Sequence, residues 1–80
     1  MAKAKFSPTY TRLRRLLVER RNVAGLSQID VAATLGKPQS YVSKIESGER
    51  RLDVVEFVEF ARALGSDPVR MLSAILSKGQ

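Results

Sequence analysis

Residues 27–51 read SQIDVAATLGKPQSYVSKIESGERR, a stretch that predicts two short helices joined by a sharp turn. We expect the first helix from Ser27 to Leu35. Asp30 follows Ser27 by three residues, and a hydroxyl and a carboxylate at this spacing can accept hydrogen bonds from the free amides of a first helical turn. The pair therefore marks a helix start.

The second helix is expected from Pro38 to Ser47. Gly36 supplies the backbone freedom needed where a helix ends, and Pro38 suits the opening of the next helix, where its missing N–H is not needed. Apolar residues recur on one side of each helix, so each should bury one face and expose the other. The outward positions of the second helix are Gln39, Ser40, Tyr41, Ser43 and Lys44.

These outward side chains carry an amide, hydroxyls, a phenol and an ammonium group. Such groups match the donor and acceptor edges of base pairs and the phosphates beside them. A solvated helix face would have a similar composition. Composition alone therefore leaves both interpretations open.

The spacing of particular residues carries more information. The relevant residues are Leu26-Ser27-Gln28, Ala32, Leu35-Gly36, Val42-Ser43, Ile45-Glu46, Gly48 and the later run Ala61-Arg62-Ala63-Leu64-Gly65. At these positions the chain resembles the helix-turn-helix of the Cro/repressor family, also called XRE-like, of bacterial and phage transcription regulators. The similarity covers residues 13–72. It implies an all-α, compact five-helix bundle like the lambda-repressor DNA-binding domain, with the helix-turn-helix at helices 2 and 3.

The resemblance also implies roles for single residues. In this family the second helix of the motif enters the major groove with its N-terminal residues on base edges. The matching base-reading positions are Gln39, Ser40 and, one turn further, Lys44. Gln39 is the leading specificity residue because an amide can bridge N6 and N7 of adenine. Contacts with the DNA backbone are expected from Ser27, Gln28, Lys37, Tyr41, Ser43, Arg50 and Arg51, with one or two of Lys37, Arg50 and Arg51 making none.

Two further positions follow from the same resemblance. In several family members an arginine near the end of the first helix pairs with the glutamate of the Ile-Glu-x-x-Gly run, and Arg21 and Glu46 match these places. We expect them to form a structural ion pair. The family commonly has a hydroxyl just before the recognition helix, where this chain has Pro38, so any contact made by that hydroxyl is absent.

Length and composition limit the remaining possibilities. Eighty residues predict one domain over 1–80, with a flexible tail over 1–6 and a C-terminal helical segment over 66–80. The absence of cysteine and histidine argues against an enzyme with a thiol nucleophile and against the usual zinc ligands, and we expect no catalytic residue, metal or cofactor. No apolar run is long enough to span a bilayer and no signal-peptide pattern occurs, so a cytoplasmic location is expected.

The basic residues are unevenly distributed. Fourteen Lys and Arg against eight Asp and Glu leave a net charge of +6. Seven of the basic residues, but only Glu19 among the acidic ones, lie within 1–25. An electropositive end favours a polyanion as partner. A membrane-surface helix is disfavoured because the apolar residues that would anchor it are needed in the core.

Three more helices complete the expected bundle. The first runs from Pro8 to Val23 after Ser7, the fourth from a capped start at Asp53 to Leu64, and the fifth over 66–77. Val54, Phe57, Val58, Ala61 and Leu64 should form the buried stripe of the fourth helix. A glycine follows each of the first four helices, at Gly25, Gly36, Gly48 and Gly65.

The expected function is that of a sequence-specific, double-stranded-DNA-binding transcriptional regulator, acting as a homodimer on a two-fold symmetric operator without an evident small-molecule effector. The alternative is a protein-interaction module with the same fold, such as an antitoxin or co-regulator that binds a partner protein. The fifth helix is apolar on more than one side, which suggests a dimer interface. The residues expected there are Phe60, Leu64, Met71, Leu72, Ile75 and Leu76.

Overall fold

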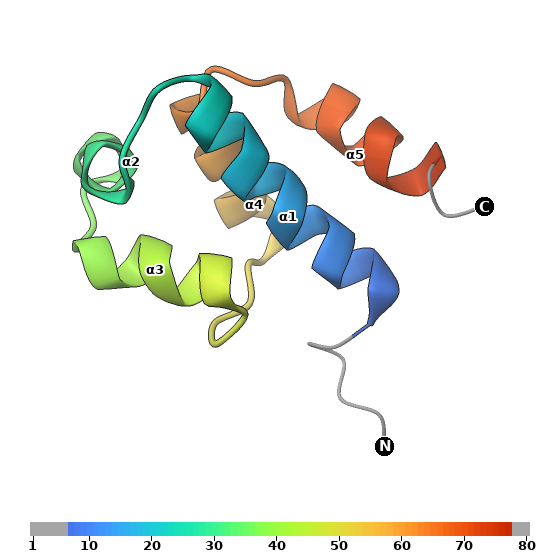
Figure 1. Ribbon diagram of the computed structural model, residues 1–80, viewed down its shortest axis with the longest axis horizontal. Helices are drawn as coiled ribbons and strands as arrows, with labels where there is room; N and C mark the ends of the chain where they lie inside the picture. Colours follow the sequence, from blue (N-terminus) through green and yellow to red (C-terminus); the bar gives the residue numbers. More distant parts are fainter. Residues whose placement is uncertain (1–6, 78–80) are drawn as a thin grey trace.

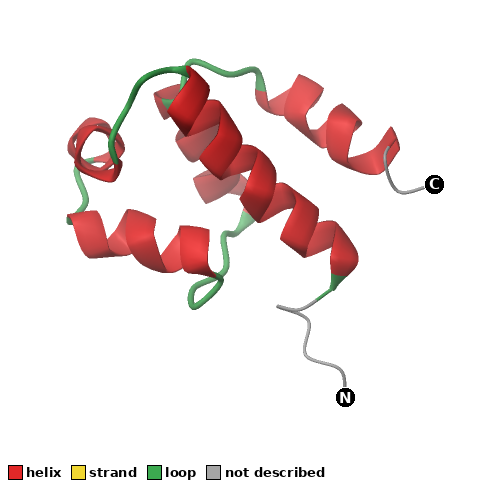
Figure 2. Cartoon of the chain, in the orientation of Figure 1, coloured by secondary structure: helices red, strands yellow, loops and turns green. Residues whose placement is uncertain are grey.

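The computed structural model describes residues 7–77 of the chain, so the tail expected over 1–6 and the last three residues of the expected C-terminal segment lie outside the described part. Five helices and no strand occur between residues 7 and 77 (Figure 2). The all-α fold expected from the sequence is confirmed. The helices are α1 (Pro8–Val23), α2 (Gln28–Leu35), α3 (Gln39–Ser47), α4 (Val54–Ala63) and α5 (Pro68–Ser77).

Reciprocal hydrogen bonds define the starts of α2 and α4. At α2 the Asp30 amide donates to the Ser27 hydroxyl at 3.0 Å, and the Ser27 amide donates to the Asp30 carboxylate at 2.8 Å. Asp53 and Glu56 make the same pair of bonds at α4, at 2.7 and 3.0 Å. These four bonds satisfy amides that have no partner inside their helices. The capped starts predicted at Ser27 and Asp53 are confirmed, with each residue just outside its helix.

The turn between α2 and α3 contains one departure from expectation. Gly36 ends α2 in the left-handed region at φ +68°, as its place in the sequence predicts. Pro38, expected inside the next helix, instead precedes it as the N-terminal cap, with φ −72° and an extended ψ of 158°. The side chain of Pro38 makes no capping hydrogen bond because it has no polar atom.

The helices surround one core in an arrangement that holds α3 on the outside of the bundle. α1 packs against α3 and α5, α2 packs against α3 and α4, and α4 packs against α5 (Figure 1). Each helix turns its apolar stripe toward the interior, as amphipathic periodicity requires. Since α3 rests on α1 and α2, these two helices determine its orientation. The largest fully buried side chains are Phe60, Leu17, Ile45, Val31 and Val42.

The way in which α5 is buried shows that most of the residues expected at a dimer interface are not exposed. Four of the six are inside the core of the single chain and are not exposed as expected: Phe60, Leu64, Met71 and Ile75. The reason is that α5 lies across α1 and α4, so one side of it fills the core. Leu72 is 46% exposed and Leu76 is 70% exposed, and Val69, which was not among the expected residues, is 73% exposed.

Val54 is a second correction, because the residue expected on the buried stripe of α4 is 77% exposed. It occupies the first position of α4, directly after the capping residue, where the helix has only begun to pack. Phe57, Ala61 and Leu64 are buried as predicted.

None of the helices within residues 7–77 has the length and apolar character needed to cross a membrane.

Candidate nucleic-acid interface

The outer face of α3 carries the three residues expected to read bases. Gln39, Ser40 and Lys44 are all exposed, whereas Val42 and Ile45 on the opposite side are fully buried. The 3.6-residue period of the helix produces this separation. The structure therefore brings the polar donors and acceptors together on one side of α3, facing away from the core.

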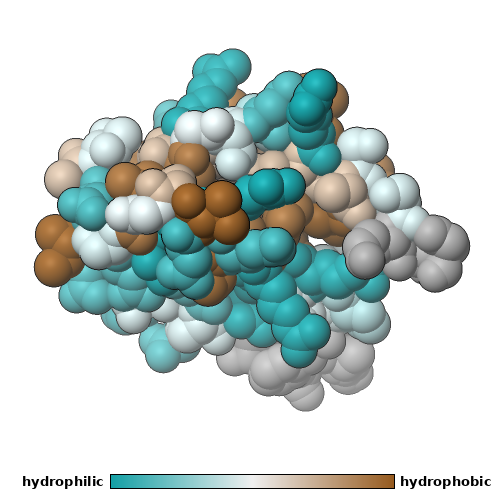
Figure 3. All heavy atoms as spheres, turned by 45° about the horizontal axis from the view of Figure 1, so that its top comes forward, coloured by the Kyte–Doolittle hydropathy of each residue, from teal (hydrophilic) through white to brown (hydrophobic). Residues whose placement is uncertain are grey.

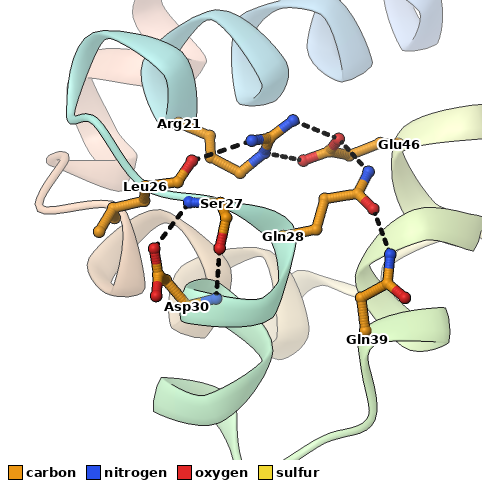
Figure 4. Close-up of polar contacts among 7 residues, drawn as sticks. All are labelled: Arg21, Leu26, Ser27, Gln28, Asp30, Gln39 and Glu46. Carbon is orange, nitrogen blue, oxygen red and sulfur yellow. Dashed lines mark hydrogen bonds and ion pairs between the residues drawn. The ribbon is translucent and has the colours of Figure 1, made fainter.

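A chain of hydrogen bonds connects the start of α3 with α2 and α1 (Figure 4). Nε2 of Gln39 donates to Oε1 of Gln28 at 2.7 Å, and Nε2 of Gln28 donates to Oε1 of Glu46 at 2.8 Å. Arg21 donates to both carboxylate oxygens of Glu46, from Nε at 2.7 Å and from Nη2 at 3.0 Å. Four side chains from three helices thus form one continuous chain.

The donor and acceptor rules fix the direction of this chain. Arg21 has only donors, and an ionised carboxylate such as that of Glu46 has only acceptors. Gln28 must therefore turn its NH₂ group toward Glu46 and its oxygen toward Gln39, whose NH₂ group must donate in turn. Because this assignment uses one N–H of Gln39, the amide of Gln39 retains one free N–H and its carbonyl oxygen.

The ion pair predicted between Arg21 and Glu46 is present. The side chains are only 13% and 7% exposed, so the pair is largely removed from water. The hydrogen bonds that Arg21 donates to the carboxylate of Glu46 raise the pKa of Arg21, which keeps the guanidinium charged. Arg21 also donates from Nη1 to the carbonyl of Leu26 at 2.9 Å, which ties the end of α1 to the start of the helix-turn-helix.

Arg14 also contributes to the site, although it was expected only as one positive charge among many. Its Nη1 donates to the backbone carbonyl of Glu46 at 2.9 Å. This carbonyl lies at the C-terminus of α3, where such groups have no partner in the helix and where a cation is favourable. Arg14 and Arg21 are seven residues apart, which is two turns of α1, and that spacing is the sequence signal that could have identified the pair.

Gly48 makes room for this contact. It ends α3 at φ +91°, a conformation that side chains with a Cβ rarely adopt. A Cβ at this position would lie 3.1 Å from Nε of Arg14. The backbone conformation thus favours glycine at the end of α3, and any larger residue would also have to displace the Arg14 side chain.

Several residues expected on the DNA backbone have partners inside the protein. The Ser27 hydroxyl accepts the capping bond from Asp30, and both amide groups of Gln28 are used in the chain to Glu46. Ser43 is half-buried, and Lys37 is exposed. The guanidinium of Arg51 lies 4.1 Å from the ring centroid of Tyr10, on α1.

Tyr41 and Arg50 form a second cluster beside α3. The ring centroid of Tyr41 is 5.2 Å from Nζ of Lys37 and 4.8 Å from Cζ of Arg50, distances typical of cation–π contacts. Arg50 also pairs with Glu56 at 2.9 Å. The hydrogen bonds from Arg50, followed by that from the Asp53 amide, lower the pKa of Glu56 to about 2, so this carboxylate is ionised throughout the neutral range.

These features together define a helix-turn-helix domain. Two short helices are joined by a glycine turn, and the second helix has a polar outer face. The side chains of Arg14, Arg21 and Glu46 hold this helix in place. A match to the helix-turn-helix family spans residues 17–70. The chain is 38% identical over 53 residues to a protein of Sinorhizobium fredii named as an uncharacterized HTH-type transcriptional regulator, y4dJ, covering 66% of this chain and 69% of that protein.

A solved structure agrees with this assignment. The XRE-family like protein from Pseudomonas syringae pv. tomato superposes with a TM-score of 0.87 at 49% sequence identity, covering 90% of this chain and 88% of that chain. The chain belongs to the helix-turn-helix family of DNA-binding transcription regulators, of the XRE type. This family is a class of regulators and not a class of enzymes.

Proposed function

We propose that this chain is a sequence-specific regulator that binds double-stranded DNA as a homodimer, with α3 in the major groove of a two-fold symmetric operator. The observation that carries the proposal is the fixed amide of Gln39. Its free N–H and free carbonyl oxygen are the donor and acceptor that match N7 and the N6 amino group of adenine. The bond to Gln28 holds this pair of groups in place before DNA arrives.

Ser40 and Lys44 complete the proposed base contacts. Lys44 lies about one turn after Ser40 on the exposed side of α3, and an ammonium group there favours O6 or N7 of guanine. Contacts with phosphates are proposed for Ser27, Lys37, Tyr41, Ser43 and Arg51, which flank α3 or lie at the edge of its outer face. A cytoplasmic location would give such a regulator direct access to its operator.

Replacing Gln39 with alanine should relax base preference at one position in each half-site, by about 1–3 kcal/mol, because the change removes one bidentate contact. The side chain is exposed, so the melting temperature should change little. Gln28→Ala should relax the same position, since it releases the Gln39 amide. Selection of binding sites from random duplexes measures the base preference of the native protein and of both variants. A symmetric consensus for the native protein would support the homodimer.

Ser47→Ala is a suitable control for this selection because Ser47 is also exposed on α3 but lies at its C-terminal end. Its consensus should equal that of the native protein. If Gln39→Ala left the consensus unchanged at every position, α3 would not read bases through its N-terminal end, and the proposed groove contact would be wrong.

Binding should also weaken steeply with salt, because a protein of net charge +6 that contacts phosphates releases counterions from the duplex. Lys37→Gln should lower the slope of log K against log salt by about 0.9 for each phosphate that a subunit no longer neutralises. Arg70→Gln is the control, since Arg70 lies on α5, which packs against α1 and α4. Association that did not depend on salt would favour the protein-interaction module instead.

A further inference from the structure

Tyr41 is held at the edge of α3 with its hydroxyl free. The side chain is half-buried, and its ring lies beside Lys37 and Arg50. The hydroxyl makes no hydrogen bond with any residue of the described range 7–77. Burial, together with the negative charge of Glu56, raises the pKa of the phenol above its usual value. The phenol is therefore protonated at neutral pH and can donate a hydrogen bond to an acceptor outside the chain.

Three of the five N–H groups of the Arg50 guanidinium donate to groups within the protein. Nη1 donates to Oε1 of Glu56 at 3.1 Å and to the backbone carbonyl of Arg51 at 3.0 Å, and Nη2 donates to Oε2 of Glu56 at 2.9 Å. Glu56 is itself held by the amide of Asp53 at the start of α4. The guanidinium is thus anchored to the first turn of α4, and the carboxylate beside it offsets its positive charge.

We infer that Arg50 is a positioning residue, which stacks between Glu56 and the Tyr41 ring so that the Tyr41 hydroxyl donates to a DNA phosphate, and that Arg50 does not itself neutralise a phosphate. The inference rests on the proposed function, in which α3 approaches the duplex. It differs from the expectation that Arg50 contacts the DNA backbone directly. It also assigns the phosphate contact to a neutral hydroxyl group, which releases no counterion of its own.

A charge-balanced variant tests whether Arg50 positions Tyr41 or itself neutralises a phosphate. Arg50→Gln combined with Glu56→Gln removes one positive and one negative charge, so the net charge is unchanged. Glutamine at position 56 can still close the capping box with Asp53, which protects the start of α4. The comparison set is the native protein, this double variant, Tyr41→Phe, the triple variant, and Lys37→Gln as the reference for removal of a charged phosphate ligand.

Operator binding is measured by fluorescence anisotropy over a range of salt concentrations. Tyr41→Phe and the double variant should each weaken binding about tenfold or more, the effect expected for one hydrogen bond to a charged acceptor. The salt slope should be unchanged in both, whereas Lys37→Gln should lower it. The triple variant should bind no more weakly than Tyr41→Phe, since the two changes remove the same contact.

A second measurement uses the free protein. The chain contains two tyrosines, and the double variant should shift the ring-proton NMR resonances of Tyr41 while those of Tyr10 remain in place. Unchanged Tyr41 resonances would show that Arg50 does not hold the ring, and the inference would be wrong.

Two results of the binding measurements would also overturn the inference that Arg50 positions Tyr41. A salt slope lowered by about 0.9 in the double variant, with affinity decreases that multiply in the triple variant, would make Arg50 a direct phosphate ligand. Native affinity in Tyr41→Phe would remove the proposed contact itself. Either result would leave normal DNA binding by the native protein in place, whereas a native protein that bound no duplex would refute the proposed function.

Discussion

Replacing Glu46 with alanine is expected to lower the free energy of unfolding by about 3 kcal/mol, because it leaves the largely buried guanidinium of Arg21 without its carboxylate partner. It also removes the acceptor that orients Gln28, and through Gln28 the amide of Gln39. In a domain of this size, a decrease of about 1 kcal/mol lowers the melting temperature by roughly 4–8 °C. Thermal unfolding followed by circular dichroism should therefore show a decrease of more than ten degrees.

Glu49→Ala is the matched control, since it removes an exposed carboxylate from the loop that follows α3. Its free energy of unfolding should stay within about 0.5 kcal/mol of the native value, as for most surface substitutions. If Glu46→Ala were as stable as Glu49→Ala, the pair with Arg21 would not hold α3 on α1, and the fixed orientation of Gln39 would lose its support.

Replacing Leu72 and Leu76 together with aspartate is expected to convert the proposed homodimer to a monomer and to weaken binding to the proposed operator by about 10²- to 10⁴-fold. These side chains form an exposed apolar stripe on α5 with Val69, and the only charged residue among those of α5 is Arg70. Two carboxylates on this stripe would repel their copies across a two-fold axis. A monomer binds one half-site at a time, whereas a dimer binds two half-sites about 34 Å apart.

Sedimentation velocity measures the change in oligomeric state. Val23→Asp is the control, because Val23 is about as exposed as Leu76 but lies at the end of α1. That variant should sediment like the native protein. Figure 3 shows hydrophobic side chains in separate groups among hydrophilic ones on the face in view, so the surface offers other apolar positions. A double aspartate variant that remained a dimer would place the interface at one of them.

The sequence alone determined the local structure of this protein. The starts of α2 and α4 follow from Ser27 with Asp30 and from Asp53 with Glu56, whose bonds span three residues. Gly36 similarly marked the end of α2. Such features depend only on the backbone conformation and side chains of neighbouring residues, so any chain with these residues at this spacing favours the same helix ends. The resemblance to the XRE-like family added the Arg21–Glu46 pair, which spans 25 residues.

Which side of α5 becomes buried was decided only by the tertiary structure. The pattern of α5 is apolar on more than one side, so it could not show that Met71 and Ile75 fill the core while Leu72 and Leu76 are exposed. The hydrophobic effect is not directional, so any arrangement that buries the same apolar area gains a similar free energy. The packing of α5 against α1 and α4 determined which of its sides is buried.

The polar contacts of the site were decided in the same way. Arg14 reaches the carbonyl of Glu46 across 32 residues, and Gln39 reaches Gln28 across 11. These bonds form because α1, α2 and α3 pack at one angle and distance, and a hydrogen bond weakens sharply when its geometry changes. The sequence could show which groups were able to donate or accept, but only the packed helices determined which donor met which acceptor.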